Sequence, residues 1–333
     1  MNDGMKANTI TLMLKAGFHK IVVVTRKTAL DELVERFGTK EQAHFYLEHN
    51  GLSFADYQNA HDVYHAALHA LQNAIPARQR SQIIDRAFLP NFLFDPADLV
   101  VTLGPDGLVV NTAKYLAEQP LLAFNPDSAR MDGVLIPFDV SAALVTLTAV
   151  LDGRYKERKI TLAEASLNDG QKIYAVNDLF VGQRTHVSAR YRLRFGDQAE
   201  DQISSGIIVS TGAGSTGWLR SVVAGSVGVV ASYNQSPKVL AVRDKQRFEA
   251  TESRLVFSVR EPFVSRVSAA DLTFGAIRGG ASLEIVSQMP QNGVIFSDGI
   301  EADFLRFDSG SIATIKVAKR KAHLVNSINA RSK

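Results

Sequence analysis

The feature that most constrains the fold is a change in the spacing of apolar residues part-way along the chain. In the first third, continuous β-branched or apolar runs at 20–25, 97–103 and 121–125 alternate with helix-spaced segments. Those helix-spaced segments are 28–37, 56–74 and 109–118. Such runs are typical of parallel strands that are buried on both faces of a sheet. The alternation predicts a doubly wound α/β domain, a fold that binds ligands at the carboxyl ends of its strands.

Beyond a last helical stretch at 139–153, the apolar residues follow a period of two. Short segments bounded by turn residues then recur, which predicts an antiparallel β-sandwich. We expect these strands at 160–167, 172–181, 187–195, 206–211, 238–242, 255–259, 282–287 and 312–317. The sequence therefore predicts an α/β domain at 1–138, a β-sandwich domain at 139–318 and a C-terminal tail at 319–333.

Composition excludes several classes of protein. The chain of 333 residues has no cysteine, which excludes a disulfide scaffold, a thiolate metal site and a cysteine nucleophile. Its net charge of +3 is small and scattered, so no nucleic-acid partner is expected. The longest apolar run, 142–151, is shorter than the roughly 20 residues of a bilayer span, and the N-terminus lacks signal-peptide features. We expect a soluble cytoplasmic protein with no membrane partner.

A Gly-Pro-Asp-Gly segment joins the second predicted strand to the next helix. Gly104 and Gly107 expose backbone N–H groups at the positive end of that helix, which suits a phosphate. Asp106 is expected at the carboxyl edge of the sheet, where a carboxylate can act as a general base. The same residues are also an ordinary β-turn signature, so the segment alone leaves both interpretations open.

Two segments of the sandwich half carry groups that suit a nucleotide. The segment 204–218 (SSGIIVSTGAGSTGW) is rich in glycine and hydroxyl groups, but it is neither a Walker motif nor a Rossmann fingerprint. Asn177 and Asp178 end an alternating strand, and an adjacent amide and carboxylate can hold the two hydroxyls of a ribose. A plain Gly/Ser loop and a strand bulge or turn are the respective alternatives.

Three histidines follow one face of the second predicted helix. His61, His65 and His69 are spaced at i, i+4 and i+8, and two such histidines can chelate a metal ion. No carboxylate companion of the HExxH kind accompanies them. We therefore expect a solvated or interfacial helix face, and no metal held by protein side chains.

Together and in this order, the segments resemble the motifs of the NAD kinase family. That family joins an α/β domain with a GGDGT loop to a β-sandwich with an Asn-Glu pair and a TPTGSTAY-like segment. The counterparts here are GPDGL at 104–108, Asn177-Asp178, and TGAGSTGW at 211–218. The resemblance is nearest to the mitochondrial-type NAD kinases and their bacterial relatives, which carry an SSG…TGTGS.AW version of the third motif. VVVTRKT, FNPDSARMDGVLIP, VREPF at 259–263 and SDGI at 297–300 extend the resemblance from about residue 20 to about residue 318.

The resemblance implies a phosphotransferase that moves a phosphoryl group from ATP, or another donor, to the 2′-hydroxyl of the adenosine ribose of NAD, making NADP. It implies that Asp106 is the catalytic base, that Gly104 and Gly107 face the donor phosphates, and that Mg²⁺ accompanies ATP. It implies NAD contacts from Asn177, Asp178, Thr211, Gly214, Ser215, Thr216 and Trp218. It also implies a homodimer or a higher homo-oligomer.

The chain departs from the family pattern at three positions. Pro105 replaces a glycine and removes a backbone N–H, and Leu108 replaces a threonine and removes a hydroxyl. Asp178 replaces a glutamate and is shorter by one methylene. The candidate base is kept while the phosphate-binding loop is altered. The alternatives are therefore a dinucleotide-binding protein of the same fold with little or no kinase activity, or a kinase for another hydroxylated substrate.

Overall fold

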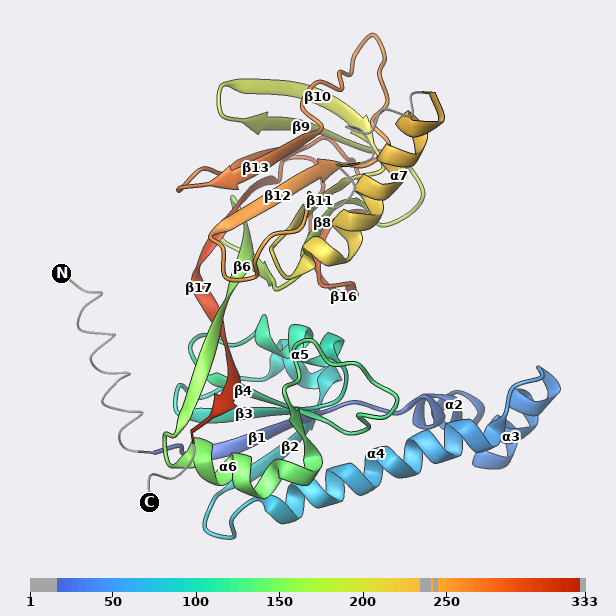
Figure 1. Cartoon of the computed structure of the whole chain (residues 1–333). Coiled ribbons are helices and arrows are strands. Elements are labelled where there is room, and N and C mark those ends of the chain that lie inside the picture. The colour runs from blue at the N-terminus through green and yellow to red at the C-terminus, as the bar shows by residue number, and fades with distance from the viewer. Residues whose placement is uncertain (1–16, 234–240, 242–244, 330–333) are drawn as a thin grey trace. The chain divides into compact units, whose positions relative to one another are not determined.

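The computed structural model describes residues 17–233, 241 and 245–329 of the chain (Figure 1). The chain divides into two compact units, residues 1–158 with 323–333 and residues 159–322. The division falls later than the boundary expected after residue 138, so the helical stretch after residue 139 belongs to the first unit. Strands β6 (Tyr155–Leu167) and β17 (Ile312–Ile328) each contribute residues to both units.

The first unit contains a parallel sheet with the strand order β2-β1-β3-β4. Its strands are β1 (Lys20–Thr25), β2 (Ser81–Asp85), β3 (Asp98–Leu103), β4 (Pro120–Asn125) and the short β5 (Phe138–Asp139), which pairs with β4. The end of β17 also pairs in parallel with β4, through His323 and Leu324. Every residue of β3 and β4 is buried, as the continuous apolar runs predicted.

Helices cover both faces of this sheet (Figure 1). Leu71 of α4 (Phe54–Ala74) and Leu147 of α6 (Ala143–Leu151) pack with residues of β1, β3 and β4 on one face. Helix α5 lies on the other face. The remaining helices of the unit are α2 (Ala29–Phe37), α3 (Lys40–His49), η1 (Arg86–Asn91), α5 (Asp106–Ala113) and η2 (Val140–Ala142).

The second unit is a β-sandwich. One layer has the antiparallel order β10-β9-β14-β17, with β6 and β7 joined to it through β17, and the other has the antiparallel order β13-β12-β11-β8-β15-β16. The buried side chains of alternating residues from both layers, Tyr191 and Phe257 among them, form one core. Besides β6 and β17, the strands of the sandwich are β7 (Lys172–Ala175), β8 (Asp178–Gln183), β9 (Ala189–Phe195), β10 (Gln198–Ser204), β11 (Ile207–Ser210), β12 (Arg254–Val259), β13 (Phe274–Arg278), β14 (Leu283–Ser287), β15 (Gly293–Ser297) and β16 (Ile300–Arg306). The predicted fold class is confirmed.

The structure differs from the expected elements in several places. Strands β2, β10, β13, β15 and β16 and helix α3 were not expected, and β17 continues to Ile328 through the segment predicted as a C-terminal tail. The strand expected at 172–181 is broken by a turn at 176–177 into β7 and β8. A helix that we did not expect, α7 (Trp218–Tyr233), follows the short η3 (Gly214–Thr216). Its valines and glycines are poor helix formers, but Leu219 packs with Phe248 and Val256 on the outer face of the sandwich. The strand expected at 238–242 lies, apart from residue 241, outside the described residues.

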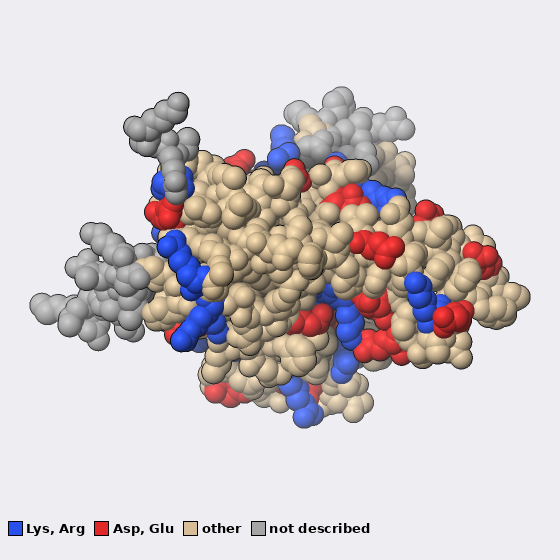
Figure 2. Space-filling model, turned by 90° about the horizontal axis from the view of Figure 1, so that it is seen from below, with Lys and Arg blue, Asp and Glu red and all other residues tan. Residues whose placement is uncertain are grey.

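One face of the molecule can be compared with the scattered charge that the sequence indicated. On the face shown in Figure 2, charged side chains form small separate groups between broad areas of uncharged residues. Within the described residues, no helix is both long and apolar enough to cross a membrane.

Candidate functional site

The parallel sheet has its topological switch point between β1 and β3. The chain leaves β1 toward β2 on one side of the sheet and leaves β3 toward β4 on the other, which is where open α/β sheets bind ligands. The Tyr64 hydroxyl of α4 accepts a hydrogen bond from the Arg26 N–H (3.1 Å) and donates one to the Leu103 carbonyl (3.3 Å). Burial raises the pKa of Tyr64, which keeps this donor protonated. One side chain therefore holds the loops that follow both strands.

The Gly-Pro-Asp-Gly segment forms the loop after β3 and the first turn of α5. Gly104 has a φ of +153°, and a Cβ there would lie 3.0 Å from the Leu108 side chain, so the position requires glycine. Pro105 is the N-cap residue of α5 and makes no side-chain capping bond. Gly107 is exposed, and a Cβ on it would meet nothing within 4 Å. The N-terminus of α5 is therefore open to an anion.

The Asp106 carboxylate is fixed by two backbone groups that sequence analysis did not find. Its Oδ2 accepts a hydrogen bond from the Val134 N–H and its Oδ1 accepts one from the Leu135 N–H, both at 3.0 Å. These bonds tie the loop after β4 to the start of α5. Because each carboxylate oxygen has a second lone pair, the side chain is oriented and still able to accept a further proton or hydrogen bond.

In the second unit, the turn that carries Asn177 and Asp178 is built around the carboxylate of Asp298. Its Oδ2 accepts a hydrogen bond from the Val176 N–H (3.0 Å), and its Oδ1 accepts bonds from the Asn177 N–H (2.7 Å) and the Asp178 N–H (3.3 Å). The Asp298 N–H donates in return to the Asp178 carbonyl (2.9 Å). Asp298 itself has a φ of +54°. The Ser-Asp-Gly-Ile segment thus fixes the backbone of the candidate ribose-binding turn.

The Asp178 side chain has an unpaired atom. Its Oδ1 is buried and has no hydrogen-bond partner among the described residues. Burial raises the pKa of Asp178 to about 7, the nearby Ser210 hydroxyl opposes the rise, and the Asp298 carboxylate adds to it. A buried polar atom without a partner costs about 1–3 kcal/mol, so the geometry suits a ligand that supplies a hydroxyl.

The hydroxyls of the Gly/Ser loop support the loop itself. Thr211 Oγ1 donates to the Val176 carbonyl and accepts hydrogen bonds from the N–H groups of Ala213 (3.1 Å) and Gly214 (3.3 Å). Ser215 Oγ donates to the Gly212 carbonyl (2.7 Å). Thr211 and Ser215 are fully buried, whereas Thr216 is exposed. The roles of Thr211, Ser215 and Thr216 as NAD contacts stay predictions. The structure shows that Thr211 and Ser215 stabilise the conformation of the loop.

Two further residues bring this loop to the Asn177-Asp178 turn. A Cβ on Gly214 would lie 2.4 Å from the Asn177 carbonyl oxygen and 2.8 Å from Asp178 Oδ1, so only glycine permits the approach. Trp218 stacks on Phe180, with ring centroids 5.8 Å apart and planes at 9°, which fixes the indole next to the turn's strand β8.

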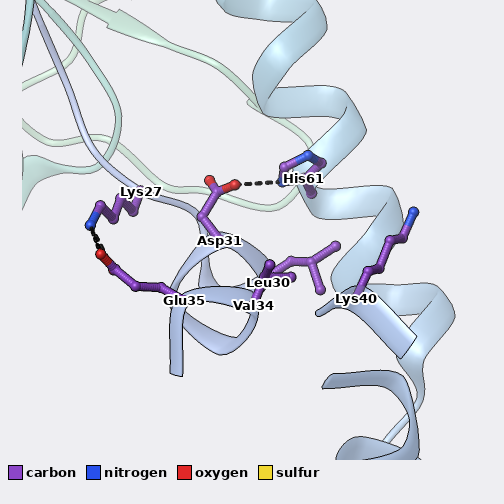
Figure 3. A pocket seen from close by; sticks show the side chains of 7 residues that line it. All are labelled: Lys27, Leu30, Asp31, Val34, Glu35, Lys40 and His61. Atoms are coloured by element: carbon purple, nitrogen blue, oxygen red, sulfur yellow. Dashed lines mark hydrogen bonds and ion pairs between the residues drawn. The ribbon is translucent and has the colours of Figure 1, made fainter. Parts of the chain in front are cut away.

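Two of the three histidines on α4 lie close to the carboxylate of Asp31, a neighbour that the spacing of residues along α4 could not predict. Asp31, in the first turn of α2, lies 3.5 Å from His61 Nδ1 and 3.6 Å from His65 Nε2, whereas His69 contacts Asn73. Burial opposes ionisation of Asp31, but hydrogen bonds from Thr28 and the two histidines lower its pKa overall. The group borders a pocket of about 570 Å³ lined by Lys27, Leu30, Asp31, Val34, Glu35, Lys40 and His61 (Figure 3).

Comparison with known proteins shows similarity to NAD kinases in sequence and in fold. No protein-family model matches the chain. The chain is 31% identical over 157 residues to the NAD kinase of Azoarcus sp. (strain BH72), covering 44% of this chain and 53% of that protein. It is 30% identical over 175 residues to the NAD kinase of Salmonella typhimurium, covering 49% and 59%. The chain thus spans between half and three fifths of the length of these curated relatives.

Solved structures share the fold. The yeast NADH kinase complexed with NADH has a TM-score of 0.56 and 15% identity, over 93% of this chain and 84% of that one. The Archaeoglobus fulgidus NAD kinase in complex with ATP has a TM-score of 0.53 and 17% identity, over 92% and 93%. Over nearly half of its length, this chain is similar in sequence to NAD kinases, and it shares the fold of the two solved structures. The nearer likeness to the mitochondrial type stays a prediction.

We expect Gly214→Ala to destabilise the second unit by about 1–3 kcal/mol, because the new methyl group overpacks against the Asn177 backbone. The control is Gly225→Ala within α7, where a Cβ meets nothing within 4 Å and the change stabilises by about 0.5–1 kcal/mol. Urea unfolding followed by the fluorescence of Trp218, the single tryptophan, measures both. Equal midpoints for the two variants would contradict the close approach.

We expect the stability of the second unit to depend on pH through Asp178. Its pKa is raised from 3.8 to about 7 on folding, so the folded state holds a proton that the unfolded state releases within that window. The stability of the wild type relative to Asp178→Asn should therefore fall as pH rises from about 4 to about 7, and change little outside it. Unfolding of both proteins across this range tests the prediction, and a constant difference would refute it.

Proposed function

We propose that the protein transfers a phosphoryl group from ATP to the 2′-hydroxyl of the adenosine ribose of NAD, giving NADP and ADP. The observation that carries the proposal is the buried, unpaired Oδ1 of Asp178 in a turn fixed by Asp298 and approached closely by Gly214. A ribose hydroxyl supplies the donor that this oxygen lacks. The partly exposed Asn177 amide, on the adjacent residue, offers both a donor and an acceptor to the second hydroxyl.

The first unit supplies groups of the kind that the donor and the reaction need. The open N-terminus of α5, with Gly104 and Gly107 beside it, suits the phosphates of ATP. Asp106 has the fixed orientation that a general base requires and would accept the proton of the attacking hydroxyl. The oxygen–phosphorus bond to the ribose then forms as the bond to ADP breaks. Mg²⁺ bound to ATP supplies charge neutralisation in such reactions.

The names of similar proteins support this choice of substrates. The curated relatives are NAD kinases, and the two solved structures contain NADH and ATP. The family resemblance also supports a homodimer or a higher homo-oligomer.

Two features of the donor loop favour a second candidate, a dinucleotide-binding protein with little kinase activity. Pro105, at the N-cap of α5, has no N–H to offer a phosphate. Leu108 is buried and contributes to packing, so its side chain offers nothing to a ligand.

A pair of variants separates binding from catalysis. We expect Asp106→Asn to lower kcat by about 10²–10⁴, with the affinity for NAD nearly unchanged, because the base acts on the reacting hydroxyl. We expect Asn177→Ala to weaken NAD binding by about 1–3 kcal/mol, because it leaves polar partners unpaired. A coupled NADP assay and calorimetry measure the two effects. Asp132→Asn, an exposed carboxylate in the loop that Asp106 anchors, is the matched control.

Loss of NAD affinity in Asp106→Asn equal to that in Asn177→Ala would show that Asp106 only supports the loop. An unchanged affinity in Asn177→Ala would remove this residue from the ribose site. NAD binding without NADP formation in the wild type would favour the binding protein over the kinase.

The effect of the loop on donor use is tested by Pro105→Gly. The substitution restores an N–H at the start of α5, and a hydrogen bond to a charged phosphate is worth about 1.5–3 kcal/mol, or roughly a tenfold to hundredfold gain in rate. We expect ATP-dependent NADP formation to rise by that factor while NAD affinity stays constant. High wild-type activity with no gain in the variant would show that the proline is neutral.

A further inference from the structure

Two helices of the first unit bring three metal-ligating side chains together. His61 and His65 lie one turn apart on α4, with ring centroids 4.2 Å apart, and Asp31 approaches them from the first turn of α2. One ligand atom from each residue lies within 4.8 Å of the other two. Among the described residues, this is the only group of three or more histidine and acidic side chains with that property.

We propose that Asp31, His61 and His65 bind a divalent transition-metal ion of the zinc class. Around a tetrahedral Zn²⁺ with bonds of about 2.0–2.1 Å to nitrogen and oxygen, neighbouring ligand atoms are about 3.4 Å apart. Asp31 Oδ1 lies 3.5 Å from His61 Nδ1, and Asp31 Oδ2 lies 3.6 Å from His65 Nε2. Because these two distances involve different oxygens of Asp31 and the three ligand atoms lie within 4.8 Å of one another, binding one ion requires the partly exposed side chains to rotate toward the tetrahedral spacing.

The ligand types determine the class of ion. Two imidazoles and one carboxylate favour Zn²⁺, Co²⁺, Ni²⁺ or Cu²⁺, whereas Mg²⁺ prefers oxygen ligands and retains its waters. The site is therefore chemically distinct from the Mg²⁺ that accompanies ATP. Three protein ligands leave the fourth coordination position of the ion for water or for a group of a bound molecule. Such a molecule could occupy the adjoining pocket, which is lined in part by Asp31 and His61 (Figure 3).

The carboxylate is already oriented by its neighbours. Asp31 Oδ2 accepts hydrogen bonds from the Thr28 N–H and the Thr28 hydroxyl, both at 2.8 Å, as part of the capping box that starts α2. Fixed outer contacts of this kind strengthen metal binding. The Thr28 hydroxyl also lies 2.9 Å from His61 Nδ1, and the metal would replace that contact.

A metal at this position would join the start of α2 to α4. Helix α4 also carries Tyr64, which holds the loops after β1 and β3. The bound ion would therefore stabilise the carboxyl edge of the parallel sheet.

The test is zinc binding to the full chain after treatment with a chelator. Calorimetry with ZnCl₂ should show a single site per chain, and Co²⁺ should give the visible spectrum of a low-symmetry, nitrogen- and oxygen-ligated ion. We expect His61→Ala and His65→Ala each to lower zinc affinity by at least about 100-fold, since even outer contacts are worth 10–100-fold. Zinc, but not magnesium, should raise the melting temperature of the wild type.

His69→Ala is the matched control, because His69 lies on the next turn of the same helix and contacts Asn73 instead of Asp31. It should leave zinc binding unchanged. Asp31→Asn keeps an oxygen acceptor for the Thr28 N–H and should lose affinity while circular dichroism shows an intact fold. Absence of zinc binding by the wild type, or equal binding by wild type and the His61→Ala, His65→Ala double variant, would overturn the proposal.

Discussion

The candidate site in the second unit depends on one carboxylate that accepts hydrogen bonds from three successive backbone amides. Asp298 turns the N–H groups of 176–178 toward itself, and this holds Asp178 with an unpaired oxygen. Without this carboxylate, the three backbone N–H groups at the turn between β7 and β8 would need water as their hydrogen-bond acceptor. Because this turn has a fixed conformation, Gly214 packs closely against the backbone of Asn177.

The first unit uses the same interaction at a different place. Asp106 accepts hydrogen bonds from the adjacent amides of Val134 and Leu135, so a loop distant in sequence is held at the start of α5. In each unit, one aspartate carboxylate accepts hydrogen bonds from adjacent backbone N–H groups and so fixes the conformation of a loop or turn. Orientation of this kind is what a positioned catalytic or binding group requires, since a reacting group must lie within hydrogen-bond reach. The structural role of Asp106 is therefore compatible with the catalytic role that we propose for it.

Much of the fold could be predicted from sequence because it depends on local patterns. Continuous apolar runs identified β1, β3 and β4, and alternation identified most strands of the sandwich. Helix α7 was missed because its valines and glycines have low helix propensity, and its packing against Phe248 decides its conformation.

The site was predictable only in part, because its decisive contacts are long-range. The motif order indicated Asp106 and the Asn177-Asp178 turn as candidates, but it gave no sign of their backbone partners. The spacing of His61 and His65 was visible, whereas Asp31 belongs to another helix and becomes their neighbour only through packing. The burial of Thr211 and Ser215 could not be read from a Gly/Ser-rich composition either.

The path of β17 has a consequence for the order in which the protein can fold during synthesis. Its end pairs with β4 through His323 and Leu324, and these residues leave the ribosome only after the whole of the second unit has been made. Until then, the edge of β4 that will receive this strand has unpaired backbone groups, a condition that invites pairing with other chains. The nascent first unit therefore lacks this strand until the sandwich has been made, and a chain stopped within the sandwich would leave that part of the β4 edge unpaired.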